Sequence, residues 1–311
     1  MKNNKSAMLL ASILMVAAVF ILAALSVGNA SKYGYAHPSS FGFSFGGIAE
    51  LRNTIEIPLE QADSLFVEYG SKNLRIFKSD SDKIIIKEYL PDDRKEALAT
   101  VDISNGVATV TSPKLDTFIV FGFNVDERIE IYIPAEGMKD ISLKTGSGNI
   151  KTQPGYTGTY ETLAVKTGSG NIKWNSSVVT EASFKAGSGN IEIVDLTGTL
   201  RAEAGSGNVT VDDFIGCGEI QTSSGNVKSY VKELNGDLRL GAGSGNVKLE
   251  IPEETSAHLD IATGSGDIHT DFDDLLSFDK YGNQADGDLV SNPANQIEVN
   301  TGSGNVRVLS H

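Results

Sequence analysis

The chain has 311 residues, a net charge of −14, 33 glycines, one tryptophan and a single cysteine. A surface of this sign repels phosphate backbones, which argues against nucleic acid as a partner. One cysteine excludes an intramolecular disulfide and a cysteine-rich metal cluster. Beyond the N-terminus, no long stretch has apolar residues at helical spacing, so the sequence predicts an all-β protein.

Residues 1–28 predict a membrane segment. An uncharged run of 21 residues, Ala7 to Val27, follows Lys2 and Lys5. At ~1.5 Å per residue this run spans a hydrocarbon layer of roughly 30 Å, and the lysines favour a cytoplasmic N-terminus. We favour an uncleaved single-pass anchor, because the run exceeds the apolar core of ~7–15 residues in signal peptides; the alternative is secretion after cleavage near Ala30. Both interpretations place the rest of the chain outside the cytoplasm.

Two irregular regions follow. Residues 29–56 are rich in glycine, serine and aromatic residues without a sustained period, which is typical of a flexible stalk. Residues 57–138 contain alternating runs and an Asn105-Gly106 hairpin signal, and they predict an irregular β cap. Within this cap, residues 65–76 are a degenerate copy of the repeat that follows, as expected of a terminal repeat.

Residues 139–311 are organised by one short phrase, [Thr/Ala]-Gly-Ser-Gly-[Asn/Asp]-[Ile/Val], which occurs eight times. Its first glycine, replaced once by Ser223, recurs at spacings of 22, 19, 18, 18, 20, 21 and 38 residues. A unit of this length predicts stacked coils, each of which buries its apolar face against its neighbours. An antiparallel sandwich is the alternative, but its loops vary freely in length, so the regular period favours a parallel β-solenoid, or β-helix-like stack, of 18–22-residue repeats.

Each repeat is expected to read strand, turn, strand and corner, with the turn at segments such as 195–198. We expect the corner glycines to supply positive φ angles, and the corner asparagines to accept the left-handed region or bond nearby backbone. Stacked corners would then align their asparagine side chains into a ladder. Inside the coil, Ile191, Val209, Val227 and Val247 are expected to stack in register. The predicted corner residues are Gly146, Asn149, Gly168, Asn171, Gly187, Asn190, Gly205, Asn208, Asn226, Gly243, Asn246, Gly264, Asp267, Gly302 and Asn305.

An insertion at residues 271–295 interrupts the repeats and accounts for the doubled spacing. Its apolar residues stand among acids, so it is expected either to cap the open end of the stack or to serve as a recognition loop. Its carboxylates are a weak candidate for a cation site, since calcium takes six to eight oxygen ligands on a defined loop, and a solvated acidic face is the stronger interpretation. The candidate carboxylates are Asp271, Asp273, Asp274 and Asp279.

The recurring corners resemble those of a known bacterial family. Together with the strand Ile131-Tyr-Ile-Pro134, the run Ile141-Ser-Leu-Lys-Thr-Gly146 and the late insertion, they are similar to the "putative adhesin" β-strand repeat domains, a family of unknown function. The resemblance covers residues 60–309. It implies an envelope-located β-solenoid, often beside a membrane anchor, and some relatives are linked with envelope-stress responses. It supplies no catalytic residues.

No catalytic or metal-binding constellation is evident, because the four histidines are scattered without ligand spacing. The leading hypothesis is therefore a non-enzymatic, envelope-anchored, extracytoplasmic module that binds an envelope protein or a cell-wall polymer along a solenoid face. A regulatory component of the envelope-stress response, acting through a membrane partner, is the second. A polysaccharide-active β-helix enzyme is the most remote. We expect no cofactor and no small-molecule substrate. Outward positions vary in sign as on a solvated face: Lys151, Lys173, Glu192, Thr210, Lys228 and Lys248.

Overall fold

The computed structural model describes residues 44–45, 49–91, 97–113, 120–121 and 126–311. The chain divides into two compact units, Met1–Ser44 with Asp116–Val120, and Phe45–Leu115 with Phe121–His311. Strands β1 (Ser44–Phe45) and β8 (Val120–Phe121) form a separate two-stranded sheet. The second unit contains the repeats.

The predicted anchor at 1–28 and most of the predicted stalk lie outside the described residues. None of the helices in the described part of the chain is long and apolar enough to cross a membrane. The range 29–56 given to the stalk extends too far, since strand β2 (Glu50–Pro58) already pairs with a strand of the cap. The alternation of Ile55 and Ile57 with polar residues explains that strand.

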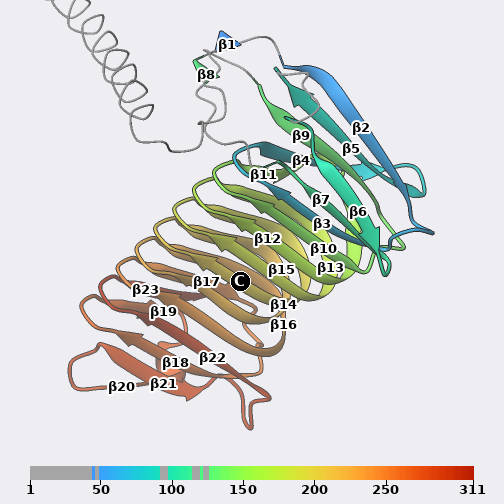
Figure 1. Ribbon diagram of the computed structural model, residues 1–311. Helices are drawn as coiled ribbons and strands as arrows, with labels where there is room; N and C mark the ends of the chain where they lie inside the picture. The colour runs from blue at the N-terminus through green and yellow to red at the C-terminus, as the bar shows by residue number, and fades with distance from the viewer. Residues whose placement is uncertain (1–43, 46–48, 92–96, 114–119, 122–125) are drawn as a thin grey trace, which may run out of the picture. The chain divides into compact units, whose positions relative to one another are not determined.

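The repeats form a solenoid of two facing layers, with the Gly-Ser-Gly-Asn corners along one edge (Figure 1). We call the strand segments that follow a corner the outgoing layer, and those that lead into a corner the incoming layer. The outgoing layer contains β4 (Asn73–Ser79), β11 (Ile150–Thr152), β17 (Val247–Ile251), β19 (Ile268–Thr270) and β23 (Val306–Ser310); the incoming layer contains β3 (Ser64–Tyr69), β10 (Asp140–Thr145), β12 (Gly158–Thr167), β18 (Ala257–Thr263) and β22 (Asn295–Thr301); and β13 (Ile172–Ala186), β14 (Ile191–Ala204), β15 (Val209–Thr222) and β16 (Val227–Ala242) contribute to both.

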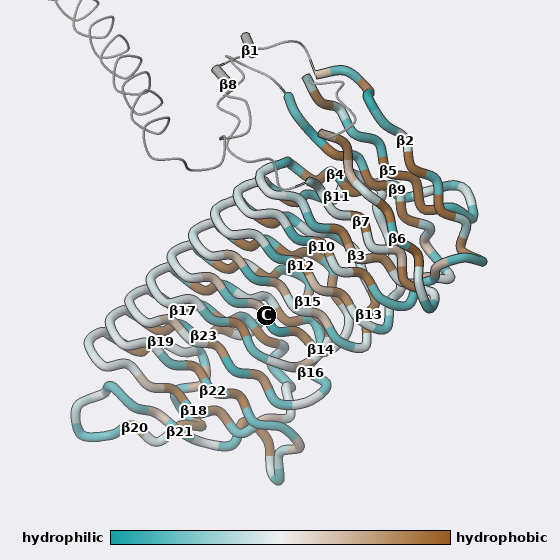
Figure 2. The backbone as a smooth tube through the Cα atoms, in the orientation of Figure 1, coloured by the Kyte–Doolittle hydropathy of each residue, from teal (hydrophilic) through white to brown (hydrophobic). Residues whose placement is uncertain are grey.

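Parallel pairing in strict register stacks equivalent residues of successive coils. Ile191 pairs with Val209, Val209 with Val227, and Val227 with Val247, and each is at most 1% exposed. The predicted in-register core is therefore confirmed. Figure 2 shows the resulting alternation of hydrophobic and hydrophilic residues along the strands, with pale, weakly polar corners. Burial of this continuous apolar interior is the main stabilising contribution, about 25 cal/mol per Å² of apolar surface.

In the central repeats, where β13, β14, β15 and β16 each run through it, the second turn is a bend rather than a break. The predicted turn at 195–198 lies inside β14, which continues because Thr197 pairs laterally with Ile215, and Gly198 with Gly216. The positive φ angles expected at the corners occur here instead, for example at Asp195 (58°) and Gly198 (135°). Hydrogen bonds to the coils on both sides hold the strand through the bend, which a single repeat read in isolation does not reveal.

At both ends of the stack, the order of coils in space differs from their order along the chain. The coil β3–β4 lies between β10–β11 and a pair of later strands, β7 (Val107–Thr111) and β9 (Arg128–Pro134). Likewise β22–β23, the last coil of the sequence, lies between β16–β17 and β18–β19. The outermost coils are therefore internal to the sequence at both ends.

Antiparallel strands cover both ends. At the N-terminal end, β5 (Lys83–Leu90) pairs with β9 and β2, and β6 (Thr100–Ser104) forms a hairpin with β7. The predicted hairpin turn is confirmed, with φ of 51° at Asn105 and 78° at Gly106. At the C-terminal end, β21 (Gln284–Asp288) pairs with β18, and β20 (Ser277–Phe278) with β21, while Phe272 and Leu276 are buried. The insertion thus covers the incoming layer of the last coil.

A buried carboxylate joins three strands of the N-terminal cap. Glu88 is fully buried and accepts hydrogen bonds from the Tyr69 hydroxyl (3.0 Å), Asn53 Nδ2 (2.7 Å) and the Ala99 backbone N–H (3.1 Å). Burial, followed by the nearby charge of Glu88, raises the pKa of Tyr69 far above its ordinary value. The phenol therefore stays a donor, and the satisfied carboxylate fixes β2, β3 and β5 relative to one another.

Candidate binding surface at the coil corners

The corner asparagines form a continuous ladder. The Oδ1 atom of each asparagine accepts a hydrogen bond of 2.8–2.9 Å from the backbone N–H of the equivalent residue in the next coil. The ladder follows the order of coils in space, so Asn246 bonds the N–H of Asn305, and Asn305 bonds that of Asp267. The predicted ladder is confirmed. In spatial order its members are Asn73, Asn149, Asn171, Asn190, Asn208, Asn226, Asn246, Asn305 and Asp267.

The threonine that opens many corners serves the same stack. The hydroxyl of Thr167 donates to the carbonyl of Gly148 in the preceding coil (2.8 Å) and accepts from the N–H of Gly170 in its own corner (3.1 Å). Thr222 makes the equivalent bonds to Gly207 and Gly225. An alanine at this position lacks the hydroxyl, and the remaining main-chain bonds hold the corner.

The corner glycines are required for close stacking, and the expectation that they supply positive φ angles is wrong. None of them has a φ between +20° and +160°. Instead, a Cβ on Gly207 would lie 1.9 Å from the carbonyl oxygen of Gly189, and one on Gly205 would lie 2.2 Å from that of Gly187. The second glycine is present in all eight phrases, whereas Ser223 occupies the first position once.

Gly207→Ala is therefore expected to destabilise the protein by about 1–3 kcal/mol, because the neighbouring carbonyl belongs to a main chain that is held on both sides. Denaturant titration of the full-length protein measures this. Gly70→Ala is the control: Gly70 is the first glycine of the N-terminal corner, and nothing lies within 4 Å of a Cβ added there. Equal midpoints for the two variants would contradict the close-stacking account.

A row of outward side chains follows the corners on each layer. We call the first outward position after the corner, on the outgoing layer, the outgoing row. Its members are neighbours by register, and six of the nine are lysine or arginine. In spatial order the outgoing row is Arg75, Lys151, Lys173, Glu192, Thr210, Lys228, Lys248, Arg307 and His269.

The corresponding incoming row is basic only in its first half. Lys144, Lys166 and Lys185 are direct neighbours there, with Glu68 and Glu203 at the two ends. Lys144 pairs with Glu68 (2.6 Å) and Lys185 with Glu203 (2.7 Å). The hydrogen bond from Lys185, together with Arg201, lowers the pKa of Glu203. The remaining members are uncharged: Gln221, Gly241, Asn300 and Ala262.

Two residues further from the corner, at the next outward position, four coils of the incoming layer carry alternating charges. Arg201 pairs with Glu219 (2.8 Å), and Arg239 pairs with Glu298 (2.6 Å). A shallow hollow of about 270 Å³ lies here, lined by Glu219, Arg239 and Glu298 together with Asp237 and neighbouring residues. Because Arg239 stands between the two glutamates in register, both carboxylates face a guanidinium rather than each other.

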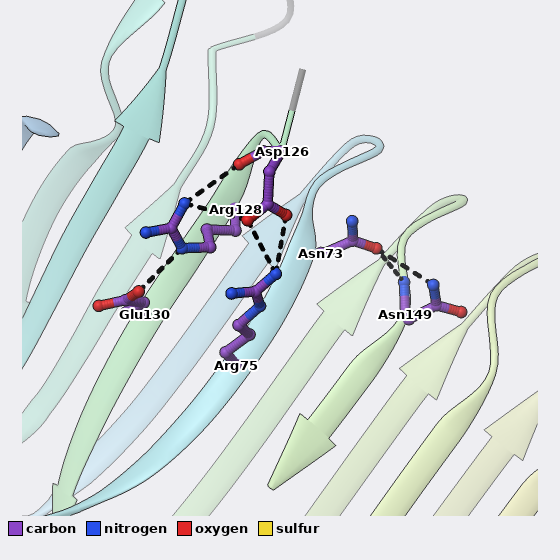
Figure 3. A network of polar contacts seen from close by, with 6 residues as sticks. All are labelled: Asn73, Arg75, Asp126, Arg128, Glu130 and Asn149. Carbon is purple, nitrogen blue, oxygen red and sulfur yellow. Dashed lines mark hydrogen bonds and ion pairs between the residues drawn. The ribbon is translucent and has the colours of Figure 1, made fainter. Parts of the chain in front are cut away.

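Figure 3 shows how the ladder begins at the N-terminal end. Asn73 accepts from Asn149, and on its other side the register partner is Arg128 of β9. Asp126 binds Arg75 (2.7 Å) and Arg128 (3.2 Å), and Arg128 also donates to Glu130 (2.8 Å). An ion network thus takes the place of the next asparagine.

The candidate cation cluster of the insertion does not form. Asp271 accepts from the N–H of Ser310 (3.0 Å), and Asp279 accepts from the N–H groups of Asn283 and Gln284 (2.9 and 3.1 Å). Within the described residues, no group of three or more His, Cys, Asp or Glu is placed to hold a metal ion. The Asp279 carboxylate instead stabilises a turn of the insertion, and the Asp271 carboxylate its contact with the C-terminal strand.

The like-charged runs of the two rows are the feature that the sequence interpretation missed. Along the chain the outward residues alternate irregularly in sign, and the set named from the sequence lacks the register partners Arg75, Arg307 and His269. A signal was present, because Lys144, Lys166 and Lys185 each directly precede a corner Thr or Ala. Equal distance from a corner is what makes residues neighbours in a stack.

Comparison with known proteins places the chain in a family. The "putative lipid binding protein" of Parabacteroides distasonis has 16% identity over 86% of this chain and 99% of its own, with a TM-score of 0.41. The "putative adhesin" of Bacteroides fragilis has 14% identity over 82% and 96%, with a TM-score of 0.40, and a "putative cell adhesion protein" of Clostridium sporogenes 14% over 83% and 98%, with 0.27. No curated protein matches. Residues 62–309 match the family described as Toastrack DUF4097, and since these are most of the chain, it belongs to that family.

Proposed function

We propose that this protein is a non-enzymatic binding module of the cell envelope, which engages an extended envelope protein or cell-wall polymer along the corner edge of its stack. The observation that carries the proposal is the in-register repetition of outward side chains over nine coils. Such rows present outward side chains at regular intervals of ~4.8 Å, which suits a partner that is itself extended.

The described residues also favour binding over catalysis. Of the carboxylates that line the hollow, Glu219 and Glu298 are each paired with an arginine, and Asp237 accepts a hydrogen bond from the backbone N–H of Gln296 (2.8 Å), so each has a structural partner. The corner asparagine Oδ1 atoms and backbone N–H groups bond one another along the ladder. A partner would therefore contact the outward side chains of the rows beside the corners.

Co-sedimentation with isolated native envelope material tests the proposal. The full-length protein, in a zwitterionic detergent, is expected to sediment with the material and to leave its polymers uncleaved. Absence of co-sedimentation would overturn the binding proposal, and new soluble fragments of the polymer would indicate an enzyme.

We further propose that residues 7–27 anchor the chain in the membrane with the repeat domain outside, as the sequence interpretation holds. Protease added to intact cells is then expected to digest the repeat domain and to leave a small membrane-bound N-terminal fragment. Permeabilised cells serve as the control for protease access. A mature protein that begins near Ser31 would instead establish a cleaved signal.

A further inference from the structure

The outgoing row contains like charges that direct stacking opposes. Arg75, Lys151 and Lys173 are direct register neighbours, and so are Lys228, Lys248 and Arg307. Like charges opposite each other on adjacent strands are destabilising, in contrast to the roughly 0.2–1 kcal/mol gained by opposite charges. The fold therefore tolerates this arrangement at a cost in stability.

The next outward row of the incoming layer arranges most of its charges differently. Arg201, Glu219, Arg239 and Glu298 alternate in sign and pair along the stack, although Glu298 also has a like-charged register neighbour, Asp260. Since the coils could carry this alternation next to the corner as well, the run of cations there calls for anions from outside the chain.

Internal acids only partly neutralise the outgoing row. Arg75 pairs with Asp126 (2.7 Å), Lys173 with Glu192, Lys228 with Asp212 (3.2 Å), and Lys248 with Glu250 (2.7 Å). In the part of the chain that the structure describes, Lys151 and Arg307 are exposed and have no ion-pair partner. These two residues leave free positive charge near the two ends of the row.

The shape of the outgoing row indicates the kind of partner. Nine positions at ~4.8 Å per coil form a line about 38 Å long and one side chain wide. A flat anionic bilayer resting on the corner edge would contact both flanks, but the incoming row is uncharged beyond Glu203. We infer that the outgoing row is a binding site for a linear polyanion that carries phosphate or carboxylate groups.

This inference rests on the proposed function and names the class of its ligand. With a net charge of −14, the chain as a whole repels polyanions, so binding depends on the outgoing row.

Binding of inorganic polyphosphate chains to the full-length protein in zwitterionic detergent tests the inference. The double variant Lys151→Glu/Arg307→Glu is expected to bind at least about tenfold more weakly in low salt. The slope of log affinity against log salt is also expected to fall, by ~0.7 for each phosphate that the variant no longer neutralises, the value for single-stranded polyanions. Lys78→Glu/Lys280→Glu is the matched control, since it makes the same charge change at exposed residues outside both rows. It is expected to retain most of the affinity.

Equal reductions in affinity for the two double variants would mean that net charge alone matters, and would overturn the inference. Tighter, row-dependent binding to vesicles of anionic phospholipid than to polyphosphate would assign the row to a membrane surface and also overturn it. If wild-type protein sediments with envelope material and the Lys151→Glu/Arg307→Glu variant does so equally, the proposed function stands and the assignment of the outgoing row is wrong. If the wild type neither sediments with envelope material nor binds polyphosphate, both the proposed function and this inference are wrong. Should the charge reversal lower the melting temperature, Lys151→Gln/Arg307→Gln replaces it.

Discussion

Deletion of residues 295–311 is expected to abolish the folded C-terminal end of the stack. It removes β22 and β23, which pair with neighbours on both sides, so β16–β17 and β18–β19 lose their shared partner at once. The asparagine ladder is also interrupted between Asn246 and Asp267. Unpaired strand edges then remain inside the stack, and these favour aggregation. Limited proteolysis and size-exclusion chromatography are expected to show cleavage after the β16–β17 coil and oligomers.

Deletion of residues 274–286 is the matched control, because it removes β20 and most of β21 at the outside of the stack and leaves β22 and β23 in place. That variant is expected to keep its circular-dichroism signature of β structure and to expose a single new edge at β18, with some oligomerisation. If the 295–311 deletion were as resistant to protease as the wild type, the coil β18–β19 would have closed directly onto β16–β17. The last coil would then be dispensable.

Val209→Asp is expected to cost about 4 kcal/mol or more and to leave little folded protein at 37 °C. Val209 is fully buried, and its register neighbours on both sides, Ile191 and Val227, are apolar, so a carboxylate there loses its hydration without gaining a partner from them. Thermal melts followed by circular dichroism measure the effect. Thr210→Asp, the adjacent outward position, is expected to melt within a few degrees of the wild type. A cooperative, unshifted melt of Val209→Asp would remove the stacked-core description.

The sequence predicts the regular part of the fold well, because one periodic phrase determines which residues become neighbours. The register of Ile191, Val209, Val227 and Val247 follows from equal distance to a corner, and so does the asparagine ladder. The reason that the corners require glycine could not be predicted from the sequence. A single repeat does not show the carbonyl of the preceding coil, and it is the carbonyl of Gly189 that excludes a Cβ from Gly207.

The exchange of coil order at the ends could not be predicted, because spacing along the chain does not determine which neighbour a coil selects. One residue is informative in hindsight. Asp267 replaces asparagine in the outermost coil, where the ladder ends with the bond from the Asp267 N–H to Asn305, and the Asp267 side chain has no following coil to bond. The candidate binding row was missed for the same reason, since Arg307 becomes a neighbour of Lys248 only through that exchange.

The position of the last coil also bears on how the protein is made. A chain that emerges from its N-terminus onward presents β18–β19 before β22–β23 exist, so the former cannot reach its final place until the final 17 residues arrive. A prematurely terminated chain is thus no shorter version of the stack. It carries an open gap with strand edges on both sides, a species that chaperones and proteases of its compartment can recognise. Placing β22–β23 between two earlier coils makes the synthesis of residues 295–311 a condition of a closed stack.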